Sequence, residues 1–102
     1  MAKFDVYLTG DGRYLLDCQA DVLSGLNSRF VVPLDDSDPG SVRRTKADDR
    51  LNPTFLVDGK ERTMLTHLAA AVSSGLLGTP VQRLEDHEYR IGAALDRLIS
   101  GF

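Results

Sequence analysis

The clearest helical periodicity in this chain lies at its C-terminal end. Apolar residues recur there at spacings of seven, four and three, with an alanine beside them, at Leu84, Ile91, Ala94, Leu95 and Leu98. Acidic residues fill the first turn at Glu85, Asp86 and Glu88, where they suit the helix dipole. Gly101 follows the last turn, where a left-handed residue is expected. The sequence therefore predicts one terminal helix whose apolar face needs a surface to cover it.

The start of the chain alternates with a period of two, which is typical of strands. Residues 4–8 alternate in this way, and the alternation resumes over residues 16–20 after a turn cluster at residues 9–12. These segments predict an N-terminal hairpin. Residues 29–34 form a β-branched run in which Pro33 indicates an edge strand or a strand end.

A second hairpin is predicted from residues 54–57 and 62–65, which flank Asp58 and Gly59. Asp-Gly suits a type I′ turn, because both central residues of that turn need a positive φ. The alanine-rich residues 66–72 fit either a helical turn or a bulged strand.

Residues 35–52 are polar and charged, and an excursion of this length in a small protein is often functional. A glycine-rich loop then leads to another short apolar segment near Val81. The order is strands, loop, strands and one terminal helix, which predicts a mostly β barrel or twisted sheet with a helix added. We expect residues 1–102 to form one domain.

Composition limits the class of function. The formal net charge is −3, so no overall basic field attracts nucleic acid, although a local basic patch stays open. The single cysteine, Cys18, can form no internal disulfide. The first residues lack the apolar run of a signal peptide, and no stretch reaches the roughly 20 apolar residues that span a bilayer. We expect a cytoplasmic protein that does not bind membranes.

Catalytic and metal chemistry find little support in the sequence. His67, His87 and Cys18 lack the spacing of metal ligands, and no cofactor motif is present. Asp35, Asp36 and Asp38 before Gly40 resemble a calcium loop but lack its later glutamate. The Gly10-Asp11-Gly12 segment carries an acid where a phosphate cradle needs donors. Cys18 lies among apolar neighbours and is predicted to be inert.

Two features leave alternatives open. The loop cations could bind phosphate, meet an acidic peptide or only solvate the loops; they are Arg13, Arg43, Arg44, Lys46 and Arg50. Ile99 and Phe102 fall beyond or beside the apolar helix face. They fit either a contact in which the helix binds a partner's groove or an anchor on the protein itself.

Segments along nearly the whole chain resemble the CcdB family of toxins from toxin–antitoxin pairs. The resemblance lies in the order and spacing of short segments rather than in one strong motif. These segments are Phe4-Asp5-Val6-Tyr7, Arg13-Tyr14, residues 17–23, Arg29-Phe30-Val31-Val32-Pro33-Leu34, Met64-Leu65-Thr66, and Leu84, His87, Glu88, Ile91, Ala94, Leu98 and Gly101 of the terminal helix.

The resemblance implies an SH3-like barrel of the CcdB/MazF type with a small accessory sheet and a C-terminal α-helix. It also implies a homodimer that needs no cofactor and performs no covalent chemistry. Such toxins bind the A subunit of DNA gyrase and trap its cleaved complex with DNA. The positions that the resemblance assigns to gyrase binding are Val22, Leu23, Glu88, Asp96, Ile99, Ser100, Gly101 and Phe102.

The resemblance further implies a CcdA-like antitoxin, whose disordered tail wraps the toxin and removes it from gyrase. Arg13, Tyr14, Arg43 and Arg44 correspond to the region that faces the antitoxin. No direct binding of nucleic acid by the toxin alone is expected.

The tail departs from the best-known members of the family, which end in Trp-Gly-Ile. This chain has Ser100 at the tryptophan position. Either the Phe102 ring takes over the contact, or gyrase is bound weakly, or a related type II topoisomerase is the target. Two other functions stay open on the same fold: a MazF/Kid-like endoribonuclease, and a non-toxic homologue that only binds antitoxin.

Overall fold

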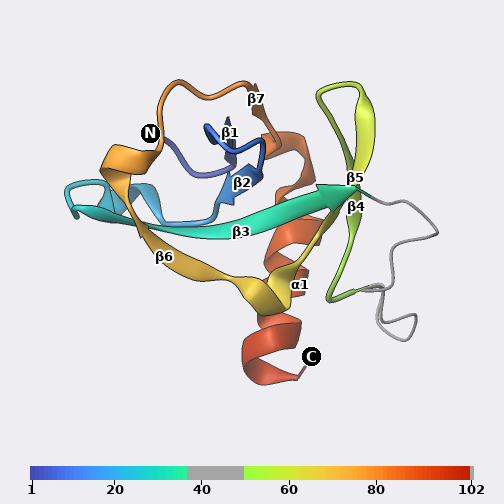
Figure 1. Cartoon of the computed structure of the whole chain (residues 1–102). Coiled ribbons are helices and arrows are strands. Elements are labelled where there is room, and N and C mark those ends of the chain that lie inside the picture. Colours follow the sequence, from blue (N-terminus) through green and yellow to red (C-terminus); the bar gives the residue numbers. More distant parts are fainter. Residues whose placement is uncertain (37–49, 102) are drawn as a thin grey trace.

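The computed structural model describes residues 1–36 and 50–101 of the chain. Most of its regular structure is strand, and one α-helix ends the chain (Figure 1). The strands are β1 Asp5–Leu8, β2 Tyr14–Asp17, β3 Ser28–Asp36, β4 Thr54–Val57, β5 Lys60–Met64, β6 Ala70–Ser73 and β7 Gln82–Arg83. Short 3₁₀ turns are η1 Asp21–Leu23, η2 Thr66–Leu68, η3 Ser74–Leu76 and η4 Glu85–His87, and the helix α1 is Glu88–Ser100.

The strands form one antiparallel sheet in the order β4-β5-β3-β2-β1-β7, with β6 also paired to β3. The sheet curls into a nearly closed barrel, and α1 lies against it (Figure 1). The β4–β5 hairpin is the accessory part, which joins the barrel through the end of β3. The predicted fold class, an SH3-like barrel with a C-terminal helix, is confirmed.

Both predicted hairpins are present. β1 pairs with β2, although β2 begins earlier than the alternation indicated and Cys18 follows it. In the β4–β5 turn, φ is +54° at Asp58 and +80° at Gly59, which is the type I′ signature. The ambiguous residues 66–72 contain both structures considered, because η2 is a helical turn and β6 is a strand.

The prediction for Pro33 was wrong, because β3 is a central strand. β2 pairs with one side of β3, and the other side pairs first with β6 and then with β5. Pro33 lies between those last two registers, which cover residues 28–31 and 34–36. Its carbonyl accepts a hydrogen bond from Leu65 N at 2.9 Å on that side. The position where other residues have an N–H lies on the same side of β3, in the gap between the β6 register and the β5 register. No strand hydrogen bond is lost there, so the sheet tolerates the proline.

The main core lies between the barrel and α1. Its central side chains are those of Val6, Leu16, Val32, Val57, Met64, Leu84 and Ile91, each at most 2% exposed. Ile91 and Ala94 of α1 are buried as the periodicity predicts, whereas Leu98 is 42% exposed because the barrel ends before the last turn. A second cluster of Tyr7, Val31 and Leu77 packs together.

Candidate functional site

The exposed face of α1 carries four of the eight predicted gyrase-binding residues. At 100° per residue, Glu88, Asp96, Ile99 and Ser100 fall within an arc of about 120°, which begins about 60° round the helix from the buried Ile91. All four of these side chains are exposed. Because the core fixes the other side of α1, this face is a rigid surface rather than a loop.

The tail continues directly from that face. Ile99 is 76% exposed, and the helix ends at Gly101, whose φ of +80° is left-handed as predicted. Gly101 N donates to the Arg97 carbonyl at 3.1 Å, and Arg97 Nη1 donates to the Gly101 carbonyl at 2.8 Å. Phe102, the remaining predicted tail residue, lies outside the described residues.

Val22 and Leu23 lie on η1, where they are 89% and 49% exposed. Two hydrogen bonds hold this turn: Gln19 Nε2 donates to the Leu23 carbonyl at 3.0 Å, and Lys3 N donates to Asp21 Oδ1 at 2.8 Å. A hollow of about 440 Å³ is bordered by Asp21 on one side and by Glu85 and Glu88 on the other. The turn therefore borders the same hollow as the start of α1, and its apolar side chains face solvent.

The predicted antitoxin-facing residues separate into two groups. Arg13 and Tyr14 line one hollow of about 400 Å³ together with Arg62 and His67. Arg13 is exposed, but Tyr14 is only 8% exposed. The Arg62 guanidinium carbon lies 4.0 Å from the centre of the Tyr14 ring, and the Tyr14 hydroxyl donates to the Asp58 carboxylate. Arg43 and Arg44 lie outside the described residues, as do Asp38, Gly40 and Lys46.

Buried charges support the barrel beneath these surfaces. Asp17 Oδ2 accepts from Arg29 Nε at 2.8 Å and lies 2.6 Å from Arg29 Nη2, and both side chains are fully buried. Asp5 Oδ1 lies 3.1 Å from Arg83 Nε. Burial, with the nearby negative charges of Asp5 and Asp17, raises the pKa of Tyr7 to about 12.

The residues considered for other chemistry have structural roles where they are described. Cys18 is 7% exposed, and its burial raises the pKa of the thiol to about 12, which keeps it protonated and unreactive. Gly12 adopts a φ of +87° in the β1–β2 turn, as expected for a hairpin rather than a phosphate cradle. In residues 1–36 and 50–101, no three His, Cys, Asp or Glu side chains gather as metal ligands.

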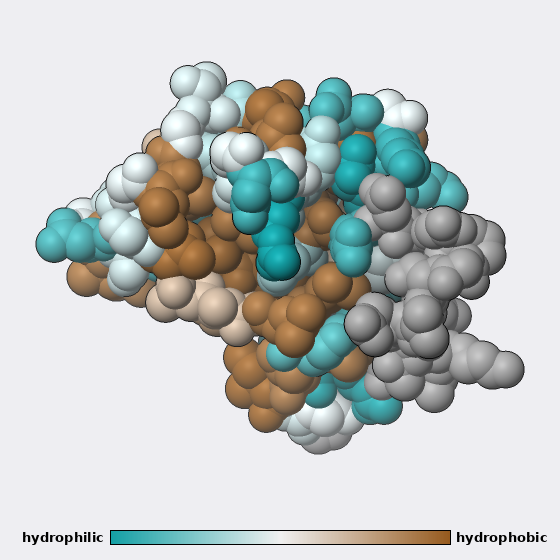
Figure 2. All heavy atoms as spheres, viewed as in Figure 1, coloured by the Kyte–Doolittle hydropathy of each residue, from teal (hydrophilic) through white to brown (hydrophobic). Residues whose placement is uncertain are grey.

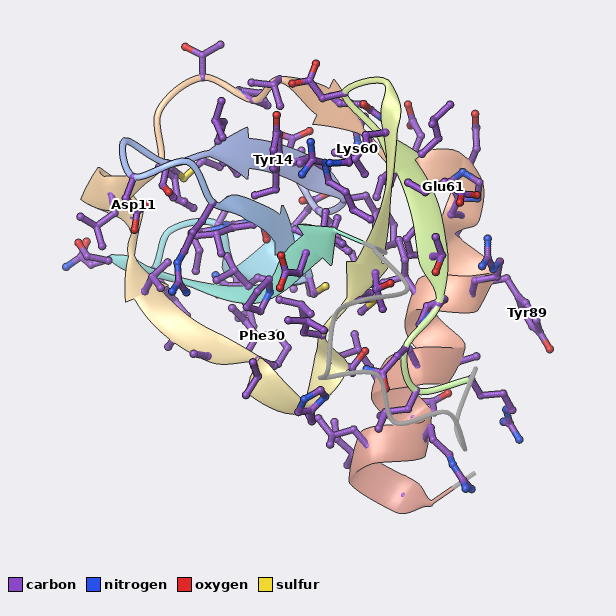
Figure 3. The ribbon with its side chains drawn as sticks, turned by 45° about the vertical axis from the view of Figure 1, so that its right-hand side comes forward. Asp11, Tyr14, Phe30, Lys60, Glu61 and Tyr89 are labelled. Atoms are coloured by element: carbon purple, nitrogen blue, oxygen red, sulfur yellow. The ribbon has the colours of Figure 1, made fainter. Side chains whose placement is uncertain are left out.

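Two residues of the α1 face escaped the sequence reasoning, which concentrated on the apolar stripe. Tyr89 is 85% exposed, and Figure 3 shows its ring pointing away from the helix. Gly92 lies one turn further along the same face. In the sequence, these two residues could have been noticed as a large aromatic residue and a glycine at positions of the helix that are otherwise polar.

The fold is therefore that of a small, nearly closed strand barrel whose C-terminal helix has an exposed outer face. The sequence model of one family, described as CcdB protein, matches residues 3–101. The chain belongs to the CcdB family, and it is therefore a toxin of a toxin–antitoxin system. The comparison with curated proteins gives no match. In the described ranges no helix is long and apolar enough to cross a bilayer.

Proposed function

We propose that this toxin binds the A subunit of DNA gyrase through α1 and the tail, and traps the cleaved gyrase–DNA complex. The observation that carries the proposal is the exposed face of α1, which runs from Glu88 to Ser100 and continues into the tail. Binding alone accounts for this activity, so we propose that the toxin is not an enzyme and works in the cytoplasm as one domain of 102 residues.

The face has the composition of an interface. Ile99 supplies an apolar contact at the end of the helix, and Glu88 and Asp96 supply charges that a basic partner surface would complement. Val22 and Leu23 supply a second exposed apolar contact on η1, beside the hollow that Asp21 and Glu88 border near the start of α1.

The test measures gyrase supercoiling and the accumulation of cleaved DNA with the purified toxin. We expect inhibition and trapped cleavage by the unaltered protein, and loss of both when residues 100–102 are deleted. The deletion removes no buried residue among those described, so its thermal midpoint should stay within about 2 °C of the parent protein. Absence of gyrase binding at micromolar toxin would rule out gyrase as the target.

We further propose that the toxin is a homodimer and that an antitoxin neutralises it. An apolar surface follows β6 and continues toward the last turns of α1 (Figure 2). Its large exposed side chains include Leu68, Leu76 and Leu98. A second copy would cover this surface. The hollow at Arg13 and Tyr14 adjoins this surface, because Leu68 lines it as well, and it is the surface proposed for an acidic segment of the antitoxin.

A further inference from the structure

Gly92 lies in the middle of α1, and nothing in residues 1–36 and 50–101 requires a glycine there. Glycine in a helix interior is less favourable than alanine, so it is normally retained where the backbone conformation or a close neighbour requires it. Neither condition holds here. Gly92 has no left-handed φ, and a Cβ at this position would meet no atom of the described residues within 4 Å. The part of the chain that the structure describes therefore does not explain this glycine.

The surroundings of Gly92 form a concave surface. A hollow of about 660 Å³ is lined by Gly92 and Ala93, by Glu88 and Asp96, by Tyr89 and by Arg50. Tyr89 is 85% exposed and stands out from the helix (Figure 3). The small residues lower the surface between these larger side chains, so a partner can approach the helix backbone here.

The chemistry of the hollow identifies its occupant. Glu88 and Asp96 lie four residues on either side of Gly92, so a carboxylate stands about one helical turn away in each direction along the same face. Two acidic residues against one basic residue, Arg50, leave the lining net negative, so a positive charge complements it. An aromatic ring also attracts a cation at its face. A basic segment fits this surface better than an acidic or purely apolar segment.

We infer that a basic segment of the partner crosses α1 at Gly92, pairs with Glu88 and Asp96, and packs against the Tyr89 ring. This inference rests on the proposed function, and the partner tested is the gyrase A subunit. Tyr89 and Gly92 then determine specificity: Tyr89 by contact area, and Gly92 by the space it leaves open.

The experiment compares dissociation constants for the purified gyrase A subunit. Gly92→Leu should raise the constant by about tenfold or more, because its side chain fills the hollow, and Tyr89→Ala should do the same by removing the ring. Gly92→Ala and Tyr89→Phe are the conservative variants and should stay within about threefold of the parent protein. Leu56→Ala alters an exposed side chain on β4 and serves as the control.

Folding is checked separately. Leucine is a better helix former than glycine, so the thermal midpoint of Gly92→Leu should not fall below that of the parent protein. The role of the two carboxylates is tested by measuring the dissociation constant at several salt concentrations. Glu88→Gln and Asp96→Asn should each make the dissociation constant less dependent on salt.

The outcomes separate the two proposals. If the parent protein does not bind the gyrase A subunit, the proposed function fails and the partner assigned here fails with it. If the parent protein binds and both Gly92→Leu and Tyr89→Ala bind equally well, only this inference is overturned. If Tyr89→Phe binds as poorly as Tyr89→Ala, packing against the ring is the wrong explanation.

Discussion

Asp17 and Arg29 show how single residues set the interior of this barrel. Both are almost completely shielded from solvent, and each ion loses several kcal/mol of hydration on burial. Their pairing offsets part of that cost, and Asp17 Oδ1 also accepts a hydrogen bond from Gln19 N at 3.0 Å. Gln19 in turn bonds to η1. The pair therefore positions the turn that carries Val22 and Leu23.

The raised pKa values of Tyr7 and Cys18 predict that the free energy of unfolding falls at alkaline pH. Their pKa values rise from 10.0 and 9.0 to about 12 in the folded protein, because burial disfavours the charged form. Each protonated group contributes fully to the stability of the folded protein below its pKa in the unfolded chain. This contribution is lost as the pH rises from that value through the higher pKa of the folded protein. We expect the thermal midpoint to fall between about pH 9 and pH 12, with Tyr7 contributing at most about 3 kcal/mol.

Three variants test this prediction by thermal unfolding across that pH range. Cys18→Ala should remove the part of the loss that begins near pH 9, and Tyr7→Phe the part that begins near pH 10. Tyr89→Phe is the matched control, because its ring is exposed rather than buried. Identical pH curves for Tyr7→Phe and the parent protein would contradict the assignment.

At the level of elements, α1 contains two glycines with opposite expected effects. Gly101 adopts a φ of +80° at the C-cap, so Gly101→Ala should destabilise the protein by about 1 kcal/mol. Gly92 is an ordinary helical position with open space beside it, so Gly92→Ala should stabilise the protein by about 0.5–1 kcal/mol.

Urea unfolding of the two variants measures both effects in the same helix. Each variant adds one methyl group, so the comparison controls for side-chain volume. If Gly92→Ala also destabilises, the open space at Gly92 is not available in solution, and the role given to this glycine loses its basis.

The predictability of each element follows from how local its determinants are. The type I′ turn at Asp58-Gly59 and the left-handed Gly101 were predictable, because the required φ values select particular residues. The α1 stripe was predictable as far as Ala94. The exposure of Leu98 was not, since it depends on where the barrel ends, and neither was the place of Pro33 inside β3.

The site was predictable to a smaller extent. The family resemblance selected Glu88, Asp96 and Ile99, and the structure shows that they share one helix face. The same reasoning passed over Tyr89 and Gly92, because an exposed residue leaves no periodic signal of its own. Tyr14 shows the converse, since a residue assigned to a surface from the resemblance has its ring largely in the core.

For the whole molecule, the apolar surface along β6 predicts the oligomeric state. Leu68 and Leu76 are 52% and 68% exposed and border a common hollow with Val72. A charge on each side chain should prevent a second copy from covering the surface. We expect the parent protein to sediment as a dimer and the double variant Leu68→Glu with Leu76→Glu to sediment as a monomer with unchanged circular dichroism.

Leu56→Glu is the control for this prediction, because Leu56 is 62% exposed on the accessory hairpin and lies away from β6. It should leave the dimer intact. A monomeric parent protein, or a double variant that still dimerises, would show that β6 is not the contact between copies.

The pairing of β1 with β7 has a consequence for synthesis of the toxin. Asp5 pairs with Arg83, and Phe4 shares a core with Leu84 and Ile91, so the two ends of the chain depend on each other. Contacts this distant in sequence form late in folding. A nascent or prematurely terminated chain lacks the residues that close the barrel and support α1. We therefore expect a fragment that lacks β7 and α1 to be unfolded and inactive.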